Sequence, residues 1–114
     1  MRAPAHRQVD SVFGALADPT RRRVVETLAR GGTVTASGLA KQLPITRQAV
    51  AKHLSALHGA DLVTAKRVGR ETHYELRPKP LDEAAHWIQM VSAEWDERLE
   101  ALRRSLEGRR GGSR

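Results

Sequence analysis

The sequence predicts one mainly helical α+β domain in which a single β-hairpin precedes a long C-terminal helix. Along most of the chain, apolar residues recur at the three- and four-residue spacing of amphipathic helices. Between residues 62 and 76 the pattern changes to two short runs of strand-forming residues, separated by Gly69 and Arg70. The chain has 114 residues, about one domain's worth of sequence.

The composition favours a polyanionic partner. Lysine and arginine total 20 against 13 aspartates and glutamates, which gives a net charge of +7. Such an excess favours nucleic acid over a membrane, because no long apolar or amphipathic basic segment is present. The chain has no cysteine, so disulfides, thiolate metal sites and cysteine nucleophiles are excluded. The N-terminus lacks the apolar core of a signal peptide, and we expect a soluble cytoplasmic protein, associated with the nucleoid when it is bound to DNA.

Two helices are expected in the first third of the chain. Residues 1–8 are expected to form a flexible arm, and the first helix then runs from about Val9 to Ala17. Asp18 is placed to cap the second helix and Pro19 to occupy its first turn. The second helix ends at the glycine pair of residues 31–32.

The next two helices are joined by a very short connection. Thr35 can cap a third helix that ends near Leu43, Pro44 breaks it, and Thr46 caps the fourth helix. Two helices connected in this way form a helix-turn-helix. The hairpin that follows directly is then a wing, and prolines end it before the last helix.

One face of the fourth helix carries no acidic residue. Its apolar residues point together toward the core, which leaves Gln48, Lys52 and Ser55 on the opposite side with alanines beside them. The N-terminal half of such a helix enters the major groove, where a glutamine can pair with adenine and small alanines let the backbone approach. The alternative is a solvated helix without a partner, but the absence of carboxylates and the adjoining wing favour DNA.

Three segments together resemble the ArsR-type winged helix-turn-helix repressors of bacteria and archaea. The segments are VFGALADPTRRRVVETL, ITRQAVAKHLSALHGADLV and VGRETHYELRP, and the match covers roughly residues 9–107, followed by a flexible basic tail at residues 108–114. The resemblance implies a dimeric transcriptional repressor, often acting on its own operon. It also implies DNA contacts from the fourth helix and places His53 where the family commonly carries histidine.

The predicted DNA-binding set combines the fourth helix with the wing tip, whose cations can straddle a phosphate or reach a minor groove. For His53 two interpretations stay open, a phosphate contact or a residue packed at the edge of the core. The predicted set is Thr46, Arg47, Gln48, Ala51, Lys52, His53, Ser55, Lys66, Arg67 and Arg70.

The sequence departs from the metal-sensing members of that family. Many of them bind metals through cysteines on the third helix, and here the segment TASGLAKQL has no thiol or imidazole. Asp82 and His86 share a face of the last helix, but the downstream ligands of the family are missing, and an ordinary surface pair explains them. We therefore expect no metal and no other cofactor; any effector would be a small molecule or a protein. Asp61 replaces the glycine usual before Leu62.

The last helix is expected from Leu81 to about Leu106, with an apolar stripe longer than one small domain can cover. A two-fold homodimer through the first and last helices would cover it and place two recognition helices about one DNA turn apart on an inverted repeat. The predicted interface residues are Val12, Phe13, Leu16, Trp87, Ile88, Val91, Trp95, Leu99, Leu102 and Leu106.

These features favour a sequence-specific DNA-binding regulator, a repressor of its own operon in the simplest case. An enzyme is disfavoured because the chain shows no Gly-rich phosphate loop, no Ser-His-Asp order with supporting context and no paired carboxylates in a plausible cleft. Two further alternatives stay open: a winged-helix module that binds nucleic acid or a partner without sequence preference, and an RNA-binding winged helix.

Overall fold

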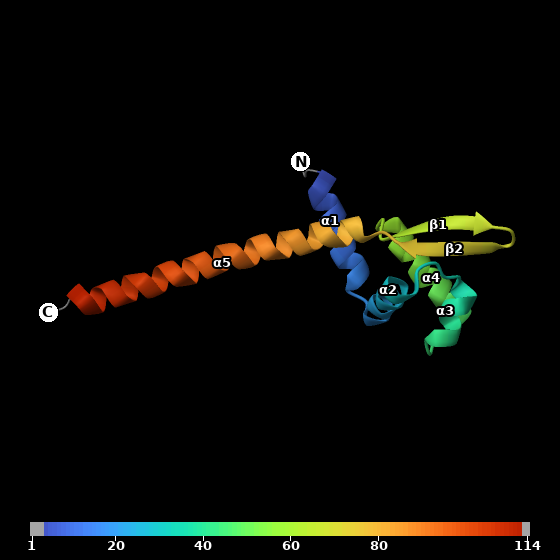
Figure 1. Ribbon diagram of the computed structural model, residues 1–114, viewed down its shortest axis with the longest axis horizontal. Coiled ribbons are helices and arrows are strands. Elements are labelled where there is room, and N and C mark those ends of the chain that lie inside the picture. The colour runs from blue at the N-terminus through green and yellow to red at the C-terminus, as the bar shows by residue number, and fades with distance from the viewer. Residues whose placement is uncertain (1–3, 113–114) are drawn as a thin grey trace. The chain divides into compact units, whose positions relative to one another are not determined.

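The computed structural model describes residues 4–112, with side chains described for residues 7–109, and it has the predicted mainly helical fold with one hairpin (Figure 1). The chain divides into two units after Ala84. The elements in order are α1 (Pro4–Leu16), α2 (Pro19–Gly31), α3 (Ala36–Gln42), α4 (Arg47–Gly59), β1 (Val63–Val68), β2 (Glu71–Leu76) and α5 (Pro78–Gly112).

The first helix is longer than the sequence predicts. α1 begins at Pro4 instead of near Val9, so residues 4–8 of the expected arm are helical, while residues 1–3 lie outside the described residues. Proline suits the first helical turn because its missing N–H would have no partner there and its φ angle is already helical. Pro4 is therefore compatible with the first turn of α1.

The last helix is also longer than predicted. α5 continues to Gly112, beyond the expected end near Leu106, so residues 108–112 of the expected tail are helical; residues 113–114 lie outside the described part. Once a helix exists, each further residue adds a hydrogen bond without a new nucleation cost. Propagation therefore carries α5 past Gly108 and into the segment that was expected to be a flexible tail.

Asp18 caps α2 as predicted, and Pro19 is the first residue of that helix. The Asp18 Oδ1 atom accepts hydrogen bonds from the N–H groups of Thr20 at 2.8 Å and Arg21 at 3.1 Å. The Arg21 N–H lowers the pKa of Asp18 below its ordinary value, and the Thr20 N–H and the positive charge of Arg21 add to this, against an opposing effect of desolvation.

This cap predicts a pH-dependent stability difference. The pKa of Asp18 is lower in the folded state than in the unfolded state, so the ionised carboxylate stabilises the fold. This contribution to the free energy of unfolding is complete above the unfolded-state pKa, about 3.9, and is lost as the pH falls through the folded-state pKa. Asp18→Ala should therefore lower the urea midpoint at pH 7, and the gap to the wild type should narrow in acid. Asp18→Asn is the control, since it keeps an uncharged acceptor. An unchanged gap between pH 7 and about pH 3 would contradict the role assigned to the charge.

The helix-turn-helix is formed by α3 and α4, which residues 43–46 connect. Both predicted caps are present: the Thr35 hydroxyl accepts from the N–H of Gly38 at 3.0 Å, and the Thr46 hydroxyl accepts from the N–H of Ala49 at 3.1 Å. Each threonine thus satisfies one N–H group that would otherwise have no partner in the first turn.

The wing is an antiparallel hairpin whose register runs from Val63 opposite Leu76 to Val68 opposite Glu71. Gly69 has a φ of 62°, in the left-handed region that favours glycine, so the predicted two-residue turn forms at this position. Val34 exchanges backbone hydrogen bonds of 2.9 and 2.7 Å with Tyr74. The segment before α3 therefore extends the edge of β2 and ties the wing to the helix-turn-helix.

Asp61 stands at the position where the resemblance leads one to expect glycine, and it adopts the left-handed conformation with a φ of 63°. Aspartate tolerates this region better than most residues. Its carboxylate also forms an exposed ion pair with the guanidinium of Arg77 at 3.3 Å. The turn after α4 therefore has the left-handed conformation that a glycine would adopt, with Asp61 in place of the glycine.

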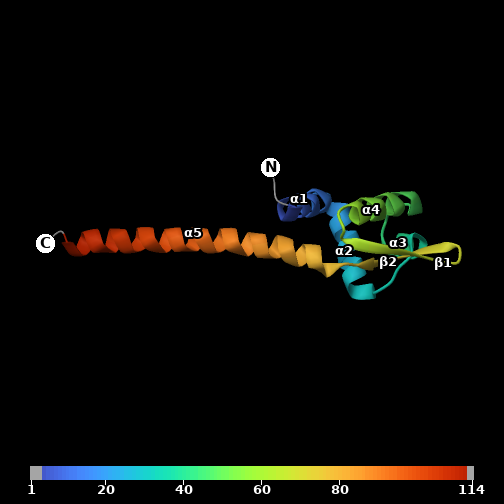
Figure 2. The same cartoon turned by 90° about the horizontal axis from the view of Figure 1, so that it is seen from above.

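The core of residues 1–84 is aliphatic and joins α1, α2, α3, α4 and β1, with Ala84 closing it. Val50, Leu54 and Leu57 are buried as predicted, which turns the opposite face of α4 outward. In both Figure 1 and Figure 2, α3, α4 and the hairpin gather at one end of this unit.

One predicted interface residue belongs to this core instead. Val12 is 0% exposed, so the expectation that it contacts a partner chain is wrong, because it has no surface to offer. Phe13 and Leu16 are partly buried against the same core. The spacing of apolar residues in α1 could not distinguish the side that meets its own domain from one that meets another chain.

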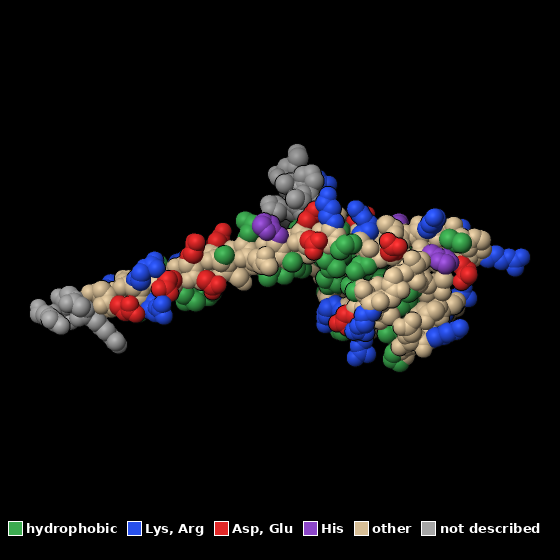
Figure 3. All heavy atoms as spheres, viewed as in Figure 1, with side chains coloured by type: hydrophobic (Ala, Val, Ile, Leu, Met, Phe, Trp, Pro, Cys, Tyr) green, Lys and Arg blue, Asp and Glu red, His purple; other side chains and the backbone are tan. Residues whose placement is uncertain are grey.

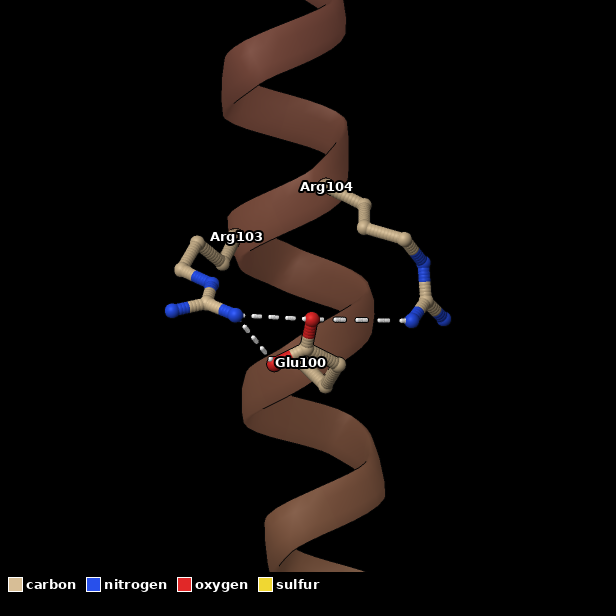
Figure 4. Close-up of polar contacts among 3 residues, drawn as sticks. All are labelled: Glu100, Arg103 and Arg104. Atoms are coloured by element: carbon tan, nitrogen blue, oxygen red, sulfur yellow. Dashed lines mark hydrogen bonds and ion pairs between the residues drawn. The ribbon is translucent and has the colours of Figure 1, made fainter.

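Residues 85–112 form the rest of α5. Glu100 bonds the guanidinium of Arg103 at 2.8 Å and approaches that of Arg104 at 3.8 Å, one turn away along the helix (Figure 4). Exposed pairs of this spacing stabilise a helix by about 0.2–0.5 kcal/mol each. Hydrophobic side chains also lie open along this helix (Figure 3). Within residues 4–112, no helix combines the length and apolarity needed to span a bilayer.

Candidate DNA-binding interface

The exposed face of α4 carries the predicted contact residues. Arg47, Gln48, Ala51, Lys52 and Ser55 are all exposed, opposite the buried apolar face of the same helix. The first turn, with Thr46 at the cap, lines an open pocket of about 330 Å³. Because α4 contains no acidic residue, this face offers donors and methyl groups without repelling phosphates.

The residue types on this face suit a DNA groove. Gln48 can offer both an amide N–H and a carbonyl to an adenine edge, and Arg47 can donate to guanine or to phosphate. The N-terminal end of α4 adds partial positive charge and free N–H groups. Ala51 has only a methyl group, so it lets the helix backbone approach the bases closely.

The wing tip presents the three predicted cations, all exposed: Lys66, Arg67 and Arg70. The Arg67 Nε atom donates to the carbonyl of Gly69 at 3.0 Å, which holds this guanidinium over its own turn. Its remaining N–H groups stay free to donate outward. Figure 3 shows basic side chains at the tip of the hairpin. Glu71, next to Arg70 in sequence, is the acidic residue closest to this tip along the chain.

His53 differs from the rest of the predicted set because it is half-buried and bonded to another helix. The Arg21 Nε atom in α2 donates to its Nδ1 atom at 3.4 Å. Arg21 is not among the residues that the sequence predicts for the site. The two residues lie 32 positions apart, and no local sequence signal connects them.

The two candidate metal ligands of the last helix have no third ligand beside them among the described residues. Among the described residues, no three histidine or acidic side chains are close enough to hold one ion. Asp82 and His86 are both exposed on α5.

Comparisons with known proteins match this architecture. A family model described as a helix-turn-helix domain matches residues 16–65. The transcriptional repressor SdpR of Bacillus subtilis is 31% identical over 80 residues, which cover 70% of this chain and 88% of that protein. The solved structure of an ArsR-like transcriptional regulator from Rhodococcus sp. RHA1 is 40% identical with a TM-score of 0.77, covering 90% of this chain and 95% of that one. The chain belongs to the ArsR family.

This ArsR-family protein is therefore a DNA-binding transcriptional regulator with a winged helix-turn-helix fold, which confirms the resemblance seen in the sequence. Members of such a family are in general not enzymes. A further solved structure is the homodimeric winged helix-turn-helix DNA-binding domain of a possible ArsR-family regulator from Mycobacterium bovis. It is 27% identical, with a TM-score of 0.61 and coverage of 76% of this chain and 80% of that one.

Proposed function

We propose that this ArsR-family regulator is a homodimeric repressor that binds an inverted repeat in its operator, in the simplest case that of its own operon. It acts in the cytoplasm on nucleoid DNA, as a binding protein and not as an enzyme. The observation that carries the proposal is the acid-free, exposed face of α4 in the same unit as the basic wing tip.

The proposed contacts fall into two groups. Gln48, with Arg47 and Lys52 beside it, reads base edges in the major groove and sets the sequence preference. Lys66, Arg67 and Arg70 bind phosphate or the adjoining minor groove and set the affinity and its salt dependence. Thr46, Ala51 and Ser55 complete the surface and allow close approach.

Exposed apolar residues on α5 support the homodimer. Trp95, at the centre of the stripe, is 59% exposed, an unusual exposure for a tryptophan in a row of apolar residues. Burial of such a row against a second copy is favourable by about 25 cal/mol per Å². The exposed apolar residues on this side of the helix are Trp87, Ile88, Val91, Trp95, Leu99, Leu102 and Leu106.

The spacing of this stripe favours an antiparallel pair. From Ile88 the steps are three, four, four and three residues, which is symmetric about Trp95. In a two-fold antiparallel pair centred there, Ile88 meets Leu102 of the second copy, Val91 meets its Leu99, and the two Trp95 side chains meet at the axis. Every layer is then apolar on both sides. Phe13 and Leu16 of α1 can extend this interface where they are exposed.

The period of the stripe also specifies how the helices wind. The apolar positions recur every eleven residues, from 88 to 99, from 91 to 102 and from 95 to 106. An eleven-residue repeat gives about 3.67 residues per turn, close to a straight helix and slightly right-handed in its supercoil. The proposed pair therefore differs from a left-handed heptad coiled coil.

Competition binding tests the proposed function. A labelled fragment from the upstream region of the gene, bound by the full chain, is challenged with unlabelled copies of itself and with bulk DNA. A sequence-specific repressor prefers its own site by at least about a thousandfold. Equal competition by bulk DNA would instead indicate a winged-helix module without sequence preference, and preferential competition by RNA would indicate an RNA-binding protein.

Metal ions are expected not to release this regulator from DNA. The chain has no thiol, and His86 with Asp82 is an i, i+4 pair of a kind that is common on helix surfaces. Zinc, nickel, cobalt and copper are titrated into the protein–operator complex, with chelator controls. A stoichiometric, saturable loss of affinity that disappears in His86→Ala would overturn this prediction.

A further inference from the structure

A hydrogen bond joins the N-terminal end of α2 to the recognition helix α4. The Arg21 Nε atom donates to the His53 Nδ1 atom at 3.4 Å, and both side chains are half-buried. Arg21 is itself held twice more: its backbone N–H bonds Asp18 at 3.1 Å, and its Nη1 atom donates to the Ala15 carbonyl at 3.4 Å. The imidazole of His53 therefore accepts a hydrogen bond from a guanidinium whose position is itself fixed by other hydrogen bonds.

This bond determines where the imidazole carries its proton. A nitrogen that accepts a hydrogen bond has no proton, so a neutral His53 must carry its proton on Nε2. No hydrogen-bond partner for the His53 Nε2 atom is found among the described residues. If Nε2 were buried, it would be a buried nitrogen without a partner, and the described residues contain no such atom. The Nε2–H group is therefore open to solvent.

The place of His53 on α4 suits a phosphate better than a base. It follows Lys52 by one residue, about 100° further round the helix, and it is half-buried while Lys52 is exposed. His53 therefore lies at the border of the DNA-facing surface, next to α2. When a helix lies in a groove, its borders face the sugar–phosphate walls and its centre faces the base edges.

We infer that His53 donates a hydrogen bond from Nε2–H to a DNA phosphate as a neutral imidazole, and that Arg21 is the positioning residue that fixes its tautomer and orientation. The inference rests on the proposed docking of α4. Among the described residues, Asp18 at the N-cap of α2 and Arg21 within α2 are charged groups that interact with His53, and Lys52 is its neighbour on α4. The Nδ1 atom accepts from Arg21, so a proton on Nδ1 would break that hydrogen bond.

A neutral donor has a distinctive signature in salt. Lysine and arginine contacts release counterions, so each adds about 0.9 to the slope of log affinity against log salt. A neutral hydrogen bond releases none. His53→Ala should therefore weaken operator binding roughly three- to tenfold, as expected for one lost hydrogen bond, and leave the slope unchanged.

The test is operator affinity of the full chain by fluorescence anisotropy, across salt concentrations and from pH 8 to pH 6. Arg21→Ala should weaken binding to a similar degree, and the double variant should be no weaker than either single variant. His53→Gln, which keeps an N–H donor, should recover part of the affinity. Arg22→Ala is the matched control, because Arg22 donates to the Leu16 carbonyl of α1 and has no bond to His53; it should bind like the wild type.

Several results would overturn the inference. One is unchanged affinity in His53→Ala, and another is additive losses in the double variant. A smaller salt slope in His53→Ala, or an affinity that rises toward pH 6 only when His53 is present, would show a charged imidazolium contact. Gln48→Ala distinguishes failure of the His53 inference from failure of the proposed docking of α4. If Gln48→Ala loses operator affinity while the His53 predictions fail, the docking stands and only the role of His53 is refuted.

Discussion

Trp95→Ala combined with Leu99→Ala is expected to give a monomer that keeps its helical spectrum but loses most of its operator affinity. Both side chains are exposed within the chain, at 59% and 45%, so their removal costs the isolated fold little. In the proposed dimer they occupy the centre of the interface. Two linked half-sites gain affinity through effective concentration, and losing that linkage is expected to weaken operator binding about a hundredfold or more.

Sedimentation velocity measures whether the double variant is a monomer, and operator titration measures its loss of DNA affinity. Met90→Ala is the matched control: Met90 is 51% exposed on the same helix but lies about 140° from Trp95. It should remain dimeric. A wild-type protein that sediments as a monomer at micromolar concentration would end the dimer proposal.

The register of the pair can be tested separately because the chain contains no cysteine. In the antiparallel pair, Trp95→Cys lies at the two-fold axis and should form a disulfide with itself on oxidation. Leu102→Cys should not, because it faces Ile88 of the second copy. Cross-linking of both variants would show a parallel pair.

Gln48→Ala is expected to cost about 1–3 kcal/mol on the cognate operator and to relax the preference for its base. Gln48 is exposed in the first turn of α4, where the proposed docking places it against a base edge. Arg70→Ala should act differently, weakening binding to all DNA about equally and reducing the salt slope by about 1, because its proposed partner is a phosphate.

Affinities for the operator and for bulk DNA, measured at several salt concentrations, separate these two effects. Gln89→Ala provides the control, since it removes another exposed glutamine, from α5 and outside residues 1–84. Unchanged operator affinity and preference in Gln48→Ala would show that the proposed docking of α4 is wrong.

Local signals in the sequence were enough to predict the elements and their order. Asp18, Thr35 and Thr46 cap the helices they were expected to cap, because a cap depends on a side chain and N–H groups only two or three residues away. The wing turn at Gly69 follows from the same kind of local restriction on φ. The outward face of α4 was predictable because helical periodicity alone separates it from the core face.

Only the tertiary structure decided the features that depend on which segments pack together. Helical periodicity placed Val12 on the apolar face of its helix, but its complete burial within its own domain depends on how that face packs into the shared core. The bond between Arg21 and His53 joins residues that are distant in sequence, and so does the pairing of Val34 with Tyr74. A one-dimensional pattern records which face a residue occupies, whereas the partner of that face is set by packing of the whole chain.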